Sequence, residues 1–498
     1  MKAAKTAILL TLPALMVGCG GGSGGGSGGN GGGTAPTTYT WQFVSLDSVA
    51  KTDVASGCSI LSQDSSDNSG ATVIAPYIAT NSNFNILYHN ESGEVTNSFN
   101  ANSSGQHIIN IAQVPDNGYV SLEEAVGLSP GNKDVYMFTV QKDLVTDLLL
   151  NVRQHSSSYA CYRGEQFTKI TTNPSSAVKV DQVSGSTKYY QTSYVDNSTN
   201  GHELASKIPV NSPLPAQARV LVTLFDNYNT SQATQLTHYT VMDASTVYDS
   251  AISGQFSGTP SDENIVTPSL TATGLSITDD SQIDVSIDNQ LYTWQSIYSL
   301  PQQYSFIDGG STIQKWAFNL KANAGSSWEA NIIAPVTATG VDIDIPNLSS
   351  FLSTTITNTA CSGKLCLSAS GYDAENYQVQ RTHLRSKTNN ASRSFYQTII
   401  APANLEQVFM DSSTESLAPD SSNDKIEVSL AKYSGTNNAA FKQFLAQSIN
   451  TQEIISGNVS QYHDTNGLVS MPSDDKSRRL ALMGEEVQMY KNSINYTP

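Results

Sequence analysis

The sequence predicts a mostly β protein made of two tandem, internally homologous β-sandwich-type units with a few short helices. Three observations lead to this fold class: alternating apolar and polar residues, sequence words that recur in order, and a weakly charged composition. Charged residues make up only 14% of the chain. Ser, Thr, Asn, Gly and Tyr abound instead, as in β proteins whose exposed strand faces are polar but uncharged.

Alternation with a period of two indicates the strands. Residues 283–287 and 341–345 carry Val or Ile at every second position, with Asp or Ser between them. One face of each strand is therefore expected to be apolar and the other solvated. Residues 220–224 and 426–430 repeat the pattern, and turn-forming clusters such as 116–118 separate the runs. Antiparallel sandwiches follow from this spacing.

A series of repeated words divides the body into two units. Tyr-Thr-Trp-Gln at 39–42 recurs at 292–295, and an Ile-Ala-Pro word at 74–76 recurs at 333–335. Later matches keep the order at a shorter offset: Tyr190-Gln191-Thr192 with Tyr396-Gln397-Thr398, Val222-Thr223-Leu224 with Val428-Ser429-Leu430, and Cys161 with Cys366. The first unit therefore holds about fifty residues that the second lacks. Convergence of strand-rich sequence on similar words is the alternative.

These words set the expected domain boundaries. The expected parts of the chain are a leader at 1–18, a flexible tether at 19–38, a β-rich unit at 39–255 with an extra segment at about 77–159, a connector at 256–290, a second β-rich unit at 291–457, and a C-terminal segment with a helix at 458–498. Insertions on a repeated scaffold usually become loops with their own role. The extra segment is therefore the first place to expect a binding surface.

Helices are expected in two places. The first follows a cap at 436–437, with a counterpart near 230–231. Its apolar face consists of Phe441, Phe444, Leu445 and Ile449. The second runs from Ser473 to about Lys491, and its stripe consists of Leu480, Met483, Val487 and Tyr490. Such stripes usually pack into a core, and docking to a partner is the alternative.

The chain begins with the layout of a cleaved export signal. A charged start precedes an apolar stretch at 7–17, which is too short to span a membrane, and then Cys19. Residues 15–19, Leu-Met-Val-Gly-Cys, resemble the lipobox of bacterial lipoproteins, although the family usually has leucine in place of Met16. The resemblance implies acylation of Cys19 and cleavage before it. Gly20, where aspartate would favour the inner membrane, implies sorting to the outer membrane. An ordinary secretory signal with a stray cysteine is the alternative.

A glycine and serine tract follows at 20–33, and such a composition behaves as a flexible spacer. The Gly-x-Ser-x-Gly pattern at 21–25 arises from this composition. It is not expected to form a nucleophile elbow, because that feature needs a strand before it and a helix after it.

Four cysteines remain besides Cys19. An even number in an oxidising compartment suggests two disulfides, with three connectivities open. The alignment of the repeat favours Cys58 with Cys161 and Cys361 with Cys366, because the equivalent cysteines then each find a partner within their own unit. A zinc site is not expected, since no second close pair or histidine stands at zinc spacing.

Charge and motifs restrict the partners and the chemistry. The net charge is −17 and no run of Lys or Arg offsets it, so nucleic acid is not an expected partner. Carboxylates at 279, 280, 284 and 288 could bind calcium, but a solvated strand face is favoured. The seven histidines show no metalloprotease spacing. No catalytic residue, metal ligand or cofactor is predicted, and a hydrolase is the less favoured reading.

The 23 tyrosines suggest a possible ligand surface. Tyr159 and Tyr162 flank Cys161, and Tyr190 and Tyr194 share a strand face. Such flat amphipathic rings can stack on sugars or protein surfaces. The favoured reading is cross-strand pairing that stabilises a sheet.

These features predict an outer-membrane-anchored cell-envelope lipoprotein with a structural, adhesive or surface-interaction role. Covalent lipid attaches it to the membrane, its body faces the periplasm or the cell surface, and envelope proteins or glycans are the expected partners. The layout alone resembles that of flagellar-sheath and other large surface lipoproteins. A glycan-binding surface lipoprotein is the alternative function, and a secreted hydrolase is the third.

Overall fold

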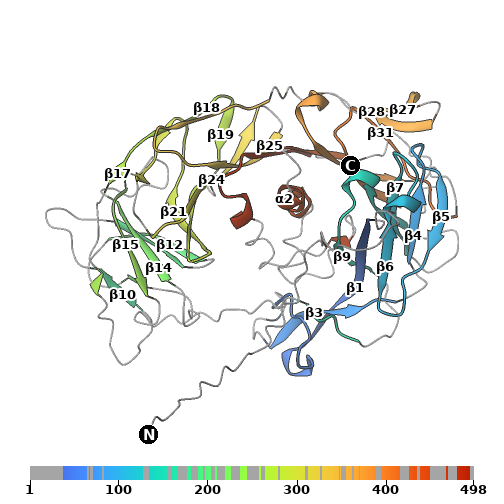
Figure 1. The fold of residues 1–498 in the computed structure, drawn as a ribbon, viewed down its shortest axis with the longest axis horizontal. Helices are drawn as coiled ribbons and strands as arrows, with labels where there is room; N and C mark the ends of the chain where they lie inside the picture. Colours follow the sequence, from blue (N-terminus) through green and yellow to red (C-terminus); the bar gives the residue numbers. More distant parts are fainter. Residues whose placement is uncertain are drawn as a thin grey trace, which may run out of the picture. The chain divides into compact units, whose positions relative to one another are not determined.

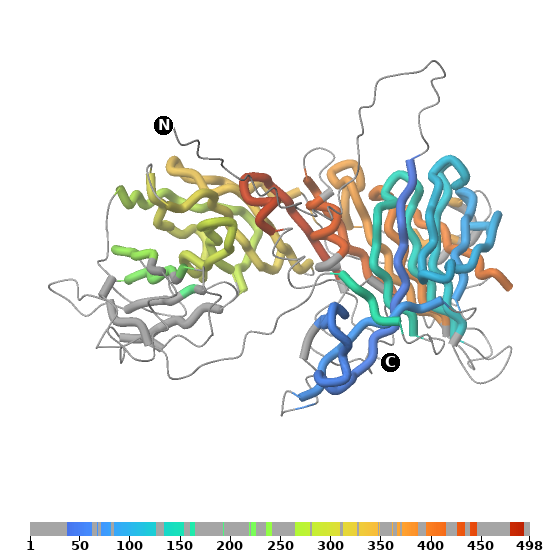
Figure 2. Tube along the Cα trace, turned by 60° about the horizontal axis from the view of Figure 1, so that its bottom comes forward, coloured from blue at the N-terminus to red at the C-terminus, as the bar shows by residue number. Residues whose placement is uncertain are grey.

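The largest element of the structure, a computed structural model, is a 13-stranded sheet (Figure 1). Its hydrogen-bonded order is β21 (Gln290–Ser296), β20 (Gln282–Ile287), β24 (Lys315–Ala324), β25 (Trp328–Pro335), β34 (Val487–Ser493), β32 (Lys425–Tyr433), β29 (Val379–Lys387), β30 (Ser394–Ala401), β8 (Asp134–Gln141), β7 (Tyr119–Val126), β4 (Phe84–His89) and β5 (Val95–Phe99), with β19 (Leu275–Ile277) paired to β24. Its strands pair antiparallel except β8 and β30, which are parallel. Figure 2 shows this pairing, with β8 in teal beside β30 in orange.

The structure describes residues 37–63, 67, 71–80, 84–126, 134–153, 160–164, 177–180, 189–194, 197–203, 208–209, 219–225, 236–243, 257–258, 264–278, 281–308, 312–325, 328–346, 348, 355–361, 364–368, 371–387, 394–414, 425–433, 438–448, 467–468 and 479–493. The leader, Cys19 and the tether up to residue 36 lie outside these residues, and Thr38, expected at the end of the tether, begins a strand. Residues 37–498 belong to one compact unit. No helix in the described part of the chain is long and apolar enough to cross a membrane.

A second sheet of six strands is built around the long strand β1 (Thr38–Ala50). Its order is β2 (Ser62–Gln63), β3 (Thr72–Ile78), β1, β9 (Leu148–Asn151) and β33 (Gly467–Leu468), with β6 (Gln106–Asn110) also on β1. The first part of β1 pairs with β6 and its second part with β3, while β9 runs parallel on the other side.

Smaller sheets and short helices complete the described fold. The sheets are β12 (Asn197–Glu203) with β11 (Tyr189–Tyr194), β14 (Arg219–Phe225) and β15 (Leu236–Asp243); β13 (Ile208–Pro209) with β10 (Ala177–Val180) and β16 (Ser257–Gly258); β22 (Gln302–Gln303) with β18 (Ser269–Ala272) and β26 (Val341–Ile343); β17 (Ile265–Val266) with β23 (Phe306–Ile307); and β27 (Thr355–Cys361) with β28 (Lys364–Ser368) and β31 (Glu406–Val408). The helices are α2 (Asn438–Ser448), η1 (Lys51–Asp53), η2 (Ile111–Gln113), η3 (Lys142–Leu144) and η4 (Ala374–Asn376). The prediction of a mostly β fold is confirmed.

Apolar cores lie on both faces of the large sheet. On β8, Phe138 belongs to one core and Met137 to another, because successive strand residues point to opposite faces. The first core also contains Trp41 of β1 and Phe444 of α2, so the six-stranded sheet and α2 cover that face. The opposite face packs against Leu367 of β28. A third core surrounds Trp294 and Tyr304, among strands β17 to β26.

The structure does not confirm the tandem repeat. The repeated words fall on β1 and β3, which pair with each other, and on β21 and β25, which do not. In the same way β11 pairs directly with β14, whereas β29 separates β30 from β32. Strands of both expected units also belong to one sheet, because β8 of the first unit pairs with β30 of the second.

Two expected segments form parts of the sheets. The extra segment at 77–159 supplies β4, β7 and β8, whose residues are largely buried, so it is not an inserted loop. The expected connector at 256–290 contains β20, which pairs on both sides within the large sheet. Hydrophobic alternation identified strands correctly. The expectation that the extra segment is a loop came from the repeat alignment, which the structure does not confirm.

The helix after 436–437 is confirmed as α2, with Phe441, Phe444 and Leu445 buried. Ile449 and the counterpart at 230–231 lie outside the described residues. The expectation of a C-terminal helix reaching Lys491 is wrong, because residues 479–482 are helical and 487–493 form β34. The apolar residues of this segment fit either one face of a helix or a strand that is buried on both faces. The segment forms a strand because it pairs with β25 on one side and β32 on the other.

Candidate binding site

The two disulfides have the connectivity that the sequence predicted. Cys58 pairs with Cys161 and Cys361 with Cys366, and the Cα atoms are 5.6 Å and 6.0 Å apart. The first bridge joins the loop after η1 to the residues beside β3. The second closes the hairpin of β27 and β28.

The tyrosines singled out from the sequence do not form one site. Tyr162 is half-buried beside β3, where its backbone carbonyl accepts from the amide of Ser59 at 2.9 Å. Tyr190 and Tyr194 lie on β11 in a different sheet, and their side chains fall outside the described residues, as does Tyr159.

The carboxylates considered for calcium also have other roles. Asp284 is buried, and its Oδ2 lies 2.5 Å from Nη2 of Arg479, so the expectation of a solvated face on β20 is wrong. Both faces of β20 are covered, which is why alternation misjudged them. Asp288 follows the strand and pairs with Arg219 at 3.1 Å. Residues 279 and 280 lie outside the described part, within which no group of three or more potential metal ligands occurs.

A partly buried network of charges lies on one face of the large sheet. Arg381 of β29 and Lys491 of β34 both pair with Glu427 of β32, the latter at 3.5 Å. Burial would raise the pKa of Glu427, but the two positive charges outweigh it and lower that pKa. Burial, with the charge of Arg381, lowers the pKa of His383 to about 3. His383 is therefore neutral, and its Nδ1 lies 2.9 Å from Oγ1 of Thr398.

The same face continues with a second buried pair. Nη1 of Arg153 lies 3.1 Å from Glu124, and its guanidinium stands 3.7 Å from the ring centre of Tyr136. Tyr136 stacks on Tyr396 with ring centres 4.5 Å apart. Glu124 and Glu427 both have arginine partners, which is the arrangement that buried charges require. We therefore interpret this network as structural.

An open pocket of about 600 Å³ offers the better candidate for a binding site. It lies between η4 and the turn that leads from β30 to β31. Its lining consists of Asp373, Ala374, Glu375, Tyr377, Pro402, Ala403, Asn404, Leu405 and Glu406. Small-ligand sites have volumes of about 300–1,000 Å³, so the pocket has room for more than one side chain.

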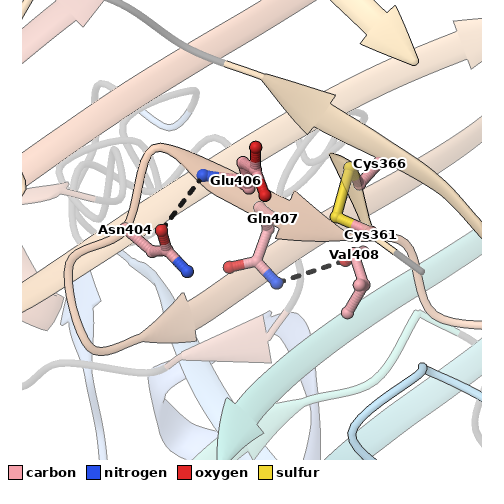
Figure 3. Close-up of a disulfide and its surroundings, with 6 residues drawn as sticks. All are labelled: Cys361, Cys366, Asn404, Glu406, Gln407 and Val408. Atoms are coloured by element: carbon pink, nitrogen blue, oxygen red, sulfur yellow. Dashed lines mark hydrogen bonds between the residues drawn. A yellow bond between two sulfur atoms is a disulfide. The ribbon is translucent and has the colours of Figure 1, made fainter. Parts of the chain in front are cut away.

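Local hydrogen bonds shape both walls. Oδ1 of Asp373 accepts from the amide of Glu375 at 3.2 Å and so caps η4. On the other wall, Oδ1 of Asn404 accepts from the amide of Glu406 at 3.3 Å (Figure 3). Asp and Asn favour such turns because their short side chains reach the backbone two residues on.

Two buried side chains next to the pocket hold the second wall in place. Oε1 of Gln380, on β29, accepts from the amide of Asn404 at 3.1 Å. The Tyr372 hydroxyl lies 2.9 Å from the same oxygen and 3.0 Å from the carbonyl of Asn404. Burial raises the pKa of Tyr372, so this hydroxyl stays protonated. The turn is therefore held by a buried side chain on a central strand.

The disulfide of Cys361 and Cys366 supports the second wall from outside. Cys366 lies on β28 directly opposite Val408 of β31, the strand that begins at Glu406. Figure 3 shows the disulfide beside this strand. The wall thus belongs to a cross-linked hairpin sheet, which favours a preformed site.

The chemistry of the lining is acidic with an apolar patch. Asp373, Glu375 and Glu406 are exposed, and no described Lys or Arg forms an ion pair with them. Leu405 is 40% exposed and is one of two exposed large apolar side chains among the described residues. Tyr377 is buried, and its hydroxyl has no hydrogen-bond partner. Burial, followed by the charge of Asp373, raises the pKa of Tyr377.

Sequence reasoning missed this pocket. Its walls are separated along the chain, and neither wall contains a known motif; only the cap at Asp373 is a local signal. Comparison with known proteins adds no further assignment: no family model matches the chain, and no curated protein matches it.

Proposed function

We propose that this chain is an exported bacterial lipoprotein, held at the outer membrane by acyl chains on Cys19. Its folded body has a structural or adhesive contact role at the cell envelope. The body faces the periplasm or the cell surface, and the tether at 20–33 separates it from the lipid.

The pairing of the cysteines is the observation that carries this proposal. All four cysteines in the described part of the chain form disulfides. Disulfides persist in oxidising compartments outside the cytoplasm. Cys19 is the remaining cysteine of the five in the sequence, and it stands at the lipobox position. Two or more acyl chains give stable membrane attachment where one does not.

The pocket supports a contact role. It combines exposed carboxylates with an exposed leucine on a wall held by hydrogen bonds and a disulfide. Preformed polar and apolar groups of this kind suit recognition of a partner.

Labelling and fractionation test the anchor. Cells expressing the full chain are labelled with palmitate, and the Cys19→Ser variant is compared with the parent. We expect the parent to carry label and to sediment with membranes, and the variant to lose the label and the sedimentation. The double variant Cys361→Ser/Cys366→Ser is the matched control and should keep its label. Equal label in the Cys19→Ser variant would contradict the proposal.

Protease treatment of intact cells then assigns the face of the membrane. A body at the cell surface is digested before the cells are lysed, whereas a periplasmic body is digested only after the outer membrane is opened. An untouched body after opening of the outer membrane, with digestion only after full lysis, would contradict export.

A further inference from the structure

The turn between β4 and β5 is packed against a segment that lies much later in the chain. Residues 90–94 connect the two strands. The carbonyl of Gly93 accepts from the amide of Asp411 at 2.8 Å. A Cβ atom on Gly93 would collide with the carbonyl oxygen of Phe409, so the two backbones are in direct contact. The turn 90–94 is therefore held by the segment 409–411.

His89, the last residue of β4, shares the same carbonyl. Its Nδ1 lies 3.1 Å from the carbonyl oxygen of Gly93. Because a carbonyl can only accept, Nδ1 carries the proton and Nε2 carries the lone pair. The side chain is completely buried, and Nε2 has no hydrogen-bond partner. A proton added to Nε2 would therefore create a buried charge and a buried N–H donor without an acceptor.

Burial outweighs the charges on the elements around His89. Burial lowers the pKa of His89 to about 4, and the hydrogen bond with Gly93 offsets only part of this effect. The titratable and charged groups on the surrounding elements are Glu91 and Glu94 of the turn, Asp411 of the later segment, Tyr119 opposite His89 on β7, and Asp116 with its partner Lys142 beside the carbonyl of His89.

Opening of the turn would change the affinity of His89 for a proton. An imidazole in water has a pKa of about 6.5, so the open form binds a proton as the pH falls below that value. The closed form binds one only near pH 4. The closed form is therefore fully favoured above pH 6.5 and loses this advantage as the pH falls toward 4.

We propose that the turn 90–94 is an acid-sensitive latch that releases the segment 409–411 when His89 gains a proton. The release is local, because Gln397 of β30 still holds Met410 through hydrogen bonds of 2.7 Å and 3.0 Å. Acid thereby frees the end of the β4–β5 hairpin, at one end of the large sheet (Figure 1), while the central strands stay paired. The latch does not depend on the lipid anchor proposed above.

Two other described histidines suit such a latch less well. His383 lies among the charges of Arg381, Lys491 and Glu427 on central strands, so its protonation would disturb the interior of the sheet. His107 is half-buried on β6, and its Nε2 lies 3.1 Å from the hydroxyl of Tyr88.

Hydrogen exchange of the full-length protein in detergent, followed by mass spectrometry from pH 8 to pH 5, tests the latch. Exchange rates are corrected for the chemical effect of pH and expressed as opening constants. In peptides that cover 90–94 and 409–413, we expect the opening constant to rise about 30-fold over this range. These peptides should also open more readily than β29 and β32. An opening constant that does not change with pH, or one equal to that of β29 and β32, would overturn the proposal.

Two histidine variants assign the pH dependence. His89→Asn can donate to Gly93 from the position of Nδ1 but takes up no proton. Its opening constant at 90–94 should change less than about twofold between pH 8 and pH 5. His107→Asn is the matched control, because burial also lowers the pKa of His107 to about 4, and it should keep the rise of the parent. A full rise in His89→Asn, or its loss in His107→Asn, would contradict the latch.

A third variant keeps the test decisive if His89→Asn does not fold. In Gly93→Ala the added Cβ collides with the carbonyl of Phe409. The turn should then already be open at pH 8 and show no further rise at pH 5, while β29 and β32 stay protected. An opening constant and a pH dependence equal to those of the parent would overturn the proposal.

Discussion

Two buried tryptophans allow a comparison of the first region (β1–β9) with the second region (β18–β26). Trp41 and Trp294 both lie in a Tyr-Thr-Trp-Gln word, and both are completely buried. Nε1 of Trp41 donates to the carbonyl of Thr146 at 3.2 Å, and that of Trp294 donates to the carbonyl of Ser305 at 2.9 Å. Yet β1 has partners on both sides, whereas β21 is an edge strand whose one partner among the described strands is β20. The same four-residue sequence thus places a buried tryptophan in both regions, but it does not determine how the strand that carries it is paired.

The largest expected loss of stability comes from removing the disulfide of the first region. Cys58 and Cys161 are 103 residues apart, whereas Cys361 and Cys366 are 5 apart. Loop entropy then predicts a loss of about 5 kcal/mol for Cys58→Ser/Cys161→Ser and about 2 kcal/mol for Cys361→Ser/Cys366→Ser. Denaturant unfolding of both double variants measures this. Equal losses would mean that strain or residual structure, rather than loop length, sets the stabilisation.

Truncating each tryptophan separates burial from strand position. Trp41→Ala and Trp294→Ala should each cost about 4 kcal/mol, because both remove a completely buried ring. Hydrogen exchange should differ, with faster exchange along β21 in Trp294→Ala than along β1 in Trp41→Ala, since an edge strand opens locally. Slower exchange at β21 than at β1 would show that edge position does not govern local opening here.

Each region also contains one buried carboxylate with an arginine partner. Glu124 and Arg153 serve the first region, and Asp284 and Arg479 the second; the arginine side chains are 12% and 23% exposed. Arg153→Met and Arg479→Met should each cost about 3 kcal/mol by leaving a buried carboxylate unpaired. The loss should be greater for Arg153, which also covers Tyr136. Thermal unfolding measures both, and losses below about 1 kcal/mol, as for exposed pairs, would contradict the burial argument.

Acid should affect the first region more, because the sequence of the second contains no histidine. Burial lowers the pKa of His89 to about 4, and its Nε2 has no hydrogen-bond partner. The unfolded chain binds the proton near pH 6.5, so stability is full above that pH and is lost as the pH falls toward 4. His89→Gln should flatten the decline between pH 6.5 and 5 by about 2 kcal/mol. An unchanged slope would show that other groups control acid unfolding.

Local pattern predicted much of the fold. Alternation identified β20, β14 and β32, and the apolar face predicted at Phe441 and Phe444 became the buried side of α2. Alternation could not reveal that Asp284 is buried, because its partner Arg479 is 195 residues away. Partners chosen by tertiary packing leave no local trace in a single sequence.

The candidate site was harder to predict for the same reason. The cysteine pairing was predicted from an alignment of repeated words, a repeat that the structure does not confirm, whereas the pocket depends on Gln380 holding Asn404. Neither a glutamine nor an asparagine at these positions predicts that hydrogen bond from the sequence. The acidic side chains of the lining are ordinary surface residues until two turns bring them to one concavity.

The position of β34 has a consequence for how a nascent chain reaches its final form. This strand lies between β25 and β32, yet it is the last strand described. Until residues 487–493 arrive, β25 and β32 each expose an unpaired edge, and such edges invite pairing with other chains. We therefore expect chains that stop before residue 487 to aggregate or to need a holding chaperone. Completion of the sheet would then act as a late checkpoint in maturation.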